Sequence, residues 1–141
     1  MRPRNFGVRV HDQQKATEGF TLYSPLWGQQ ANLMNMNGEI VHQWELPGHP
    51  GGYARLLPNG NLFYAASTDD GPPFKGGAKG GLIREVDWNN NVVMEYRDDW
   101  QHHDVRKLPN DNILYAGWEM MPEETAGKVK GGVPGTELPE G

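Results

Sequence analysis

The sequence predicts an all-β protein built from repeated units of four antiparallel strands. Nineteen glycines and eleven prolines divide the 141 residues into short segments. These segments are rich in β-branched and aromatic residues and are separated by Asn-Gly and Pro-Asn turns, which is typical of short strands. A hairpin pattern also returns after about fifty residues, which indicates an internal repeat.

The expected strands are short, and turn residues bound each of them. Asn37-Gly38 lies between two β-forming segments and predicts the clearest hairpin, because Asn-Gly readily adopts the positive φ angles of a two-residue turn. Residues 68–81 are expected as a polar surface loop, and residues 119–141 as a loop or tail. The expected strands are Val8–Val10, Phe20–Tyr23, Ala31–Met36, Glu39–Trp44, Tyr53–Leu57, Asn61–Ala66, Leu82–Trp88, Val92–Tyr96, His103–Leu108 and Ile113–Trp118.

The repeat predicts the type of β architecture. Asn37–Trp44 matches Asn89–Tyr96, and Leu57–Asn61 matches Leu108–Asn112. Each period holds four expected strands, and a four-stranded unit of about 40–50 residues is typical of a β-propeller blade. A β-sandwich with two similar hairpins is the alternative interpretation.

Under the propeller interpretation, the 141 residues form a single partial domain. We expect blade one at residues 7–46, blade two at 53–97 and half of blade three at 102–118. Propellers close with about four to eight blades, so the sequence predicts that missing C-terminal blades or another chain complete the ring. Without them, edge strands and blade faces would be exposed.

Composition and charge exclude several classes of partner. The formal net charge of −5 and the scattered basic residues provide no electrostatic footprint for nucleic acid. The absence of cysteine excludes disulfides and leaves the redox compartment open. The N-terminal segment lacks a signal-peptide pattern, and no apolar run approaches the roughly 18 residues of a membrane span. We therefore expect neither a nucleic-acid nor a membrane partner, and the compartment is left open.

His102, His103 and Asp104 form the densest cluster of chemically active side chains. They lie at the expected start of an innermost strand beside the central channel, where the earlier repeat has Gly51 and Gly52. Strand alternation predicts that the two histidines point to opposite sides, so that only one lines the channel. Asp104 is expected to orient an imidazole and fix its tautomer. A structural His-Asp contact between blades is the alternative.

Arg106, Arg55 and Trp100 complete the candidate site. Arg106 follows Asp104 on the same strand face, and Arg55 is its equivalent in the preceding repeat. Two arginines along a channel predict binding of a small anion, with ion pairing between blades as the alternative. Trp100 either flanks an aromatic substrate or anchors its loop. We expect no cofactor and no metal site, because neighbouring strand residues diverge and no further ligand is evident.

The order of several motifs resembles the arylsulfotransferase family. The resemblance covers most of residues 19–137, and its most specific part is the His-His-Asp stretch followed by a Leu-Pro-Asn turn. The matching segments are Gly19–Tyr23, Leu33–Trp44, Leu57–Leu62, Ile83–Trp88, His102–Asn110 and Gly131–Glu137.

This resemblance implies the N-terminal portion of a six-bladed β-propeller enzyme with its site in the central channel. Family enzymes transfer a sulfuryl group from a phenolic sulfate ester to a phenol through a transiently sulfated histidine, while further histidines and an arginine stabilise charge. By match to the motif, His102 or His103 assists acid–base chemistry or binds the sulfuryl group. The family's nucleophilic histidine lies in later blades and has no counterpart here. A periplasmic or secreted location is also compatible with the family.

Two other functions stay open from the sequence. A non-catalytic propeller subunit or binding module would hold a small anion or a partner chain in its channel. A different propeller enzyme, such as a hydrolase or lyase, would use the same His-Asp pair.

Overall fold

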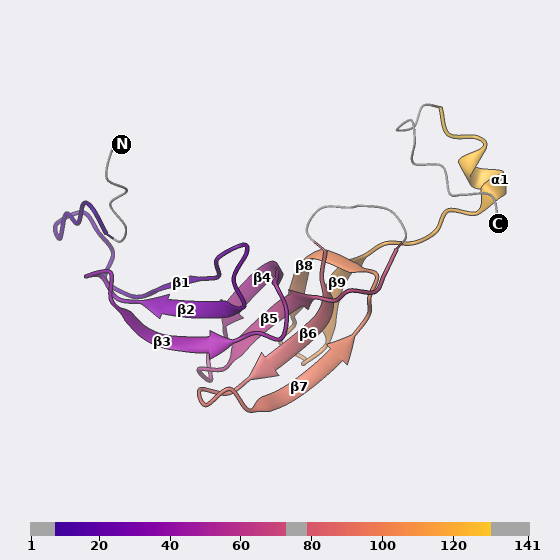
Figure 1. Ribbon diagram of the computed structural model, residues 1–141. Helices are drawn as coiled ribbons and strands as arrows, with labels where there is room; N and C mark the ends of the chain where they lie inside the picture. The colour runs from indigo at the N-terminus through magenta and orange to yellow at the C-terminus, as the bar shows by residue number, and fades with distance from the viewer. Residues whose placement is uncertain (1–7, 73–78, 131–141) are drawn as a thin grey trace.

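The structure is a computed structural model that describes residues 8–72 and 79–130, and it is all-β with antiparallel sheets. Figure 1 shows three sheets side by side, with β1, β4 and β8 along one side of the arrangement. Within the described residues the sheets stay separate, and none closes on itself. The strands are β1 (Thr21–Tyr23), β2 (Gln30–Met34), β3 (Ile40–Glu45), β4 (Pro50–Leu56), β5 (Leu62–Ser67), β6 (Gly81–Val86), β7 (Val92–Arg97), β8 (Gln101–Lys107) and β9 (Ile113–Gly117).

The strands of each sheet follow chain order. The first sheet contains β1, β2 and β3, the second contains β4 to β7, and the third contains β8 and β9. Short turns connect most neighbours, and polar side chains organise them. The turn between β6 and β7 is typical: the Asp87 carboxylate accepts hydrogen bonds from the backbone N–H groups of Asn89 and Asn91 at 2.9 and 2.8 Å. The hairpins predicted from the turn residues are therefore confirmed.

The internal repeat is present in the strand registers. Ala54 pairs with Tyr64 in the second sheet as Val105 pairs with Tyr115 in the third. The β2–β3 and β6–β7 pairs also share one register, including an irregularity at the same place, after Leu33 in one and after Glu85 in the other. Positive φ angles fall at equivalent positions as well, in the pairs Gly38 and Asn90, Gly52 and His103, and Gly60 and Asp111.

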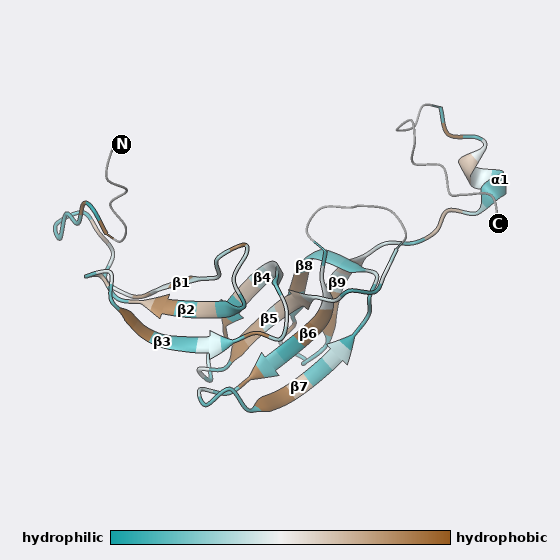
Figure 2. Ribbon diagram, viewed as in Figure 1, coloured by the Kyte–Doolittle hydropathy of each residue, from teal (hydrophilic) through white to brown (hydrophobic). Residues whose placement is uncertain are grey.

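The hydrophobic core lies on both faces of the second sheet, and β5 is buried along almost its whole length. Because side chains alternate along a strand, β5 contributes to two clusters. Leu62, Tyr64 and Ala66 pack toward the first sheet. Phe63 and Ala65 pack with Val105 of the third sheet. Figure 2 shows the hydrophobic residues along β5, in the middle of the arrangement.

Aromatic side chains fasten the first sheet to the second. The Trp44 indole N–H donates to the Asp87 carbonyl at 3.0 Å. The His42 ring stacks on Trp88 with centroids 3.8 Å apart. His42 is therefore a packing residue of the interface between the first two sheets.

One expectation about the N-terminal segment needs correction. Val8–Val10 is not a strand: no described residue pairs with it, and Val10 is 88% exposed. Its valine alternation satisfies the pattern, but the segment pairs with none of the described strands. The expected loop or tail after residue 118 includes a four-residue helix, α1 (Glu123–Ala126), and no strand between residues 119 and 130. The motif at Gly131–Glu137 and part of the Gly-rich loop lie outside the described residues.

Candidate functional site

The predicted site lies on a bulge near the start of β8. His102 pairs with Ala116 and Val105 pairs with Tyr115, so His103 and Asp104 are extra residues with no partner on β9. His103 has a φ of 55°, in the left-handed region that non-glycine residues seldom adopt. Such a conformation costs about 1–2 kcal/mol and tends to occur at functional positions. Gly52 occupies the same bulge in β4, with a φ of 94°.

The bulge brings the two imidazoles together. The Nδ1 atoms of His102 and His103 lie 2.8 Å apart, and the rings meet nearly edge to face. The prediction that the two side chains diverge is therefore wrong, because the left-handed residue interrupts the alternation. A hydrogen bond between these atoms requires that one Nδ1 carries a proton and the other does not.

The surroundings of His102 favour its neutral form. Burial lowers the pKa of His102, and a charge on His103 lowers it further. The ring of Trp118 lies against the His102 ring with centroids 4.2 Å apart. Lys79 forms a single antiparallel bridge with His102 on the side away from β9. His102 can therefore accept a proton or a hydrogen bond at neutral pH.

Asp104 interacts with Arg106 and with the backbone of Val105. The Asp104 carboxylate forms an ion pair with Arg106 and accepts a hydrogen bond from the Val105 N–H at 3.0 Å. The predicted contact between Asp104 and an imidazole is not formed in the described part of the chain, because the bulge turns the carboxylate along the strand. The Arg106 guanidinium also lies over the Tyr53 ring, 4.5 Å from its centroid. Tyr53 thus joins β4 to the candidate site.

The other two candidate residues, Arg55 and Trp100, lie on β4 and directly before β8. Arg55 lines a cavity of about 580 Å³ at the turn end of the sheets, together with Lys107. The backbone carbonyl of Trp100 accepts a hydrogen bond from the Trp118 N–H at 2.8 Å.

Buried contacts hold β8 on both sides of the bulge. Gln101 is 1% exposed, and its side-chain oxygen accepts a hydrogen bond from the Gly81 N–H at 3.1 Å. Val105 is fully buried in the core. Beyond it, Lys107 donates to the buried Glu85 carboxylate at 2.5 Å. The exposed bulge therefore projects from a fixed frame.

Hydrogen bonds control the ionisation of this frame. Burial alone would raise the pKa of Glu85, but the hydrogen bonds from Lys107 and Asn61 outweigh it and hold this pKa below its usual value. On β9, the strand that pairs with β8, the Tyr115 hydroxyl donates to Asp98 at 2.7 Å and lies 3.2 Å from the Tyr96 hydroxyl. These hydrogen bonds raise the pKa of Tyr115 above its usual range.

Sequence reasoning missed Tyr53, Gln101 and Trp118. A signal existed for Tyr53, which occupies the repeat position of Asp104. Gln101 could be recognised only through its burial over Gly80, where an added Cβ would lie 1.7 Å from the Gln101 side-chain oxygen. The absence of a side chain at Gly80 thus makes room for a buried amide.

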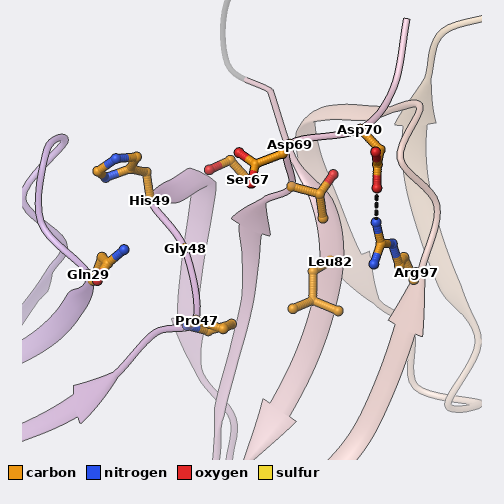
Figure 3. Close-up of a pocket in the computed structure, with 10 residues that line it drawn as sticks. Gln29, Pro47, Gly48, His49, Ser67, Asp69, Asp70, Leu82 and Arg97 are labelled. Atoms are coloured by element: carbon orange, nitrogen blue, oxygen red, sulfur yellow. Dashed lines mark hydrogen bonds and ion pairs between the residues drawn. The ribbon is translucent and has the colours of Figure 1, made fainter.

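A second cavity, with a volume of about 440 Å³, lies at the opposite end of the sheets from the cavity that Arg55 lines, close to the start of β4 and the end of β5. His49 lines this cavity. Figure 3 shows Arg97 directed at Asp70, with which it forms an ion pair of 2.5 Å. Arg97 also binds Asp99 at 3.0 Å. Because these carboxylates already pair with Arg97, this arginine is not free to bind an anion.

Comparisons with protein-family models, with curated proteins and with solved structures find no match. Residues 8–72 and 79–130 contain no group of three or more His, Asp or Glu side chains suited to a metal ion. The same residues include no helix that is long and apolar enough to cross a membrane.

Proposed function

We propose that this chain is the N-terminal portion of an arylsulfotransferase-like β-propeller enzyme. In this proposal the three sheets are blades, and further blades complete the ring. The enzyme transfers a sulfuryl group from a phenolic sulfate ester to a phenol. The repeated strand registers support the blade assignment, because successive blades of a propeller reuse one four-stranded pattern.

The observation that carries the proposal is the contact between His102 and His103 on a left-handed bulge. The equivalent backbone position in β4 is filled by Gly52, for which this conformation is inexpensive. A histidine at this position carries a conformational cost, and a role in binding or catalysis would explain why it is present.

In the proposed reaction, the histidine pair binds and stabilises the transferring group. A protonated imidazole donates hydrogen bonds to sulfuryl oxygens or delivers a proton to the departing phenolate, and the neutral partner accepts the proton of the incoming phenol. Asp104 and Tyr53 orient Arg106, which supplies a fixed positive charge further along β8. The covalent step on a nucleophilic histidine belongs to the remaining blades.

The test is a transfer assay on the complete assembly, with 4-nitrophenyl sulfate as donor and phenol as acceptor. We expect His102→Ala and His103→Ala to lower kcat/KM by about 10²–10⁴-fold, the usual range for general acid–base groups. His49→Ala, at an exposed histidine outside the bulge, is the matched control and should keep full activity. Full activity in both bulge variants would contradict the proposal.

The same assay separates the alternative functions. Release of 4-nitrophenol without sulfation of the acceptor would indicate a hydrolase. Binding of sulfate or of an aryl sulfate without turnover would indicate a non-catalytic propeller subunit that binds a small anion. Binding of only a partner chain would indicate an interaction module.

A further inference from the structure

In the described part of the chain, the first sheet has one strand fewer than the repeat predicts. The register of β1 with β2 places Thr21, Leu22 and Tyr23 opposite Met34, Leu33 and Asn32. The register of β5 with β6 places Leu62, Phe63 and Tyr64 opposite Val86, Glu85 and Arg84. Since β2 corresponds to β6, β1 corresponds to β5.

The equivalents of β1 in the other sheets each have an inner neighbour. β5 pairs with β4 along one edge, and β9 pairs with β8 in the same register. A tyrosine marks the shared position in all three sheets, as Tyr23, Tyr64 and Tyr115. Among the described residues, nothing pairs with the corresponding edge of β1.

A cavity lies where the missing strand would run. It has a volume of about 230 Å³ and is lined by residues of the β1 region, including Leu22, Tyr23 and Leu26, and by residues of β4, including Gly52 and Tyr53. On its other side, β4 runs directly beside β8, since a Cβ added to Gly52 would lie 3.2 Å from the His103 carbonyl oxygen. β4 therefore has β8 on one side and the cavity on the other. The cavity lies where the equivalent strand of the first sheet would run.

The surroundings of β1 are apolar and exposed. Phe20 is 65% exposed, Leu26 is 66% exposed and Trp27 is 83% exposed. Exposed apolar side chains beside an unpaired strand edge are typical of a surface that another segment covers. The described residues supply no spare strand, because every one of their strands already belongs to a sheet.

We propose that the free edge of β1 binds one extended strand of a partner polypeptide, antiparallel to β1. The two template strands define the chemistry of this segment. Opposite the shared tyrosine they carry a small apolar residue, Ala54 or Val105, and the next residue is an arginine in both, Arg55 or Arg106. The partner strand accordingly places Ala or Val opposite Tyr23 and Arg opposite Leu22. This inference depends on the repeat and is independent of the sulfuryl chemistry.

The first test uses the 141-residue chain and a synthetic peptide with the sequence of residues 50–59. Binding is followed by fluorescence anisotropy of the labelled peptide and by amide hydrogen exchange. We expect saturable binding and at least tenfold slower exchange in residues 20–24. Tyr23→Ala should weaken binding at least tenfold, whereas Tyr96→Ala, a matched change on β7, should not. A peptide with proline at the position of Arg55 is the control and should not bind. Equal protection by both peptides, or none, would overturn the proposal.

The second test identifies the natural occupant. A photo-crosslinking amino acid replaces Leu22 in the native assembly, and the crosslinked peptide is sequenced. A segment of a separate chain with the small-residue–Arg pattern supports the proposal. A segment of the same polypeptide, a second copy of this chain, or a peptide without that pattern would overturn it. Both tests measure strand binding at β1. Their results therefore do not depend on whether the assembly shows transfer activity in the assay of the proposed function.

Discussion

The left-handed backbone of His103 should reverse the usual preference for alanine over glycine in a strand. Inside a regular strand, glycine costs about 0.5–1 kcal/mol relative to alanine because it loses more conformational freedom on folding. At a φ of 55°, however, a Cβ atom is itself unfavourable by about 1–2 kcal/mol. We therefore expect His103→Gly to be more stable than His103→Ala by about 1 kcal/mol. Both variants lose the same imidazole, so their difference isolates the backbone.

The equivalent glycine provides the reciprocal change. Gly52 has a φ of 94°, and a Cβ there would lie 3.2 Å from the His103 carbonyl oxygen. Gly52→Ala should therefore lower the free energy of unfolding by about 1–2 kcal/mol. Ala116→Gly, in the regular strand opposite His102, is the control, and its loss should be only about 0.5–1 kcal/mol.

Urea denaturation followed by tryptophan fluorescence measures these differences in the free energy of unfolding. We expect His103→Gly to have a higher free energy of unfolding than His103→Ala, and both variants to keep the denaturant slope of the wild type. If His103→Ala proves as stable as His103→Gly, the left-handed bulge is absent in solution, and the contact between the two histidines has no structural basis. His103→Gly should nevertheless lose transfer activity, which separates stability from function.

Two further changes test the frame that holds the bulge. Lys107→Met should lower the free energy of unfolding at pH 7 by about 2–3 kcal/mol, because it leaves the Glu85 carboxylate, which is 2% exposed, without its cation. The pKa of Glu85 is lowered in the folded wild type, so this stabilisation is present above the unfolded pKa and is lost as the pH falls through the folded pKa. The deficit of the variant should therefore shrink toward pH 4, and a deficit that is constant with pH would contradict this reasoning. Tyr115→Phe should cost about 1 kcal/mol at pH 7 by removing the hydrogen bond to Asp98. Because the pKa of Tyr115 is raised in the folded state, the wild type should lose this advantage as the pH rises above about 10. If the wild type and the variant have the same free energy of unfolding below pH 10, the hydrogen bond does not contribute to stability.

Local turn chemistry explains why most of the fold could be predicted. Asn37-Gly38 and Pro58-Asn59 determine their turns within a few residues, so the hairpins and their repeat follow from the sequence. Val8–Val10 shows the limit of this reasoning, because a strand needs a partner edge that its own residues do not encode. The open edge of β1 could not be predicted for the same reason.

The geometry of the candidate site depends on contacts that lie far apart in the sequence. Alternation predicts divergent histidines, whereas the register of β8 against β9 inserts two residues and brings them together. Proximity in the sequence predicts a contact between Asp104 and an imidazole. The Asp104 carboxylate instead pairs with Arg106, which lies over the Tyr53 ring. The Gly51-Gly52 pair in the earlier repeat contained the missing information, since glycine there signals a backbone that histidine adopts at a cost.

The shared bulge also bears on how such a protein can change during evolution. Because Gly52 and His103 adopt one backbone conformation, exchanging the side chain at this position need not refold the sheet. The exchange is not equally open in both repeats, however. A Cβ on Gly51 would lie 3.0 Å from the Gly80 backbone, whereas His102 already has room for its ring beside Trp118. Reactive groups can thus be lost from the later repeat by single substitutions, but gaining them in the earlier one requires neighbouring changes first.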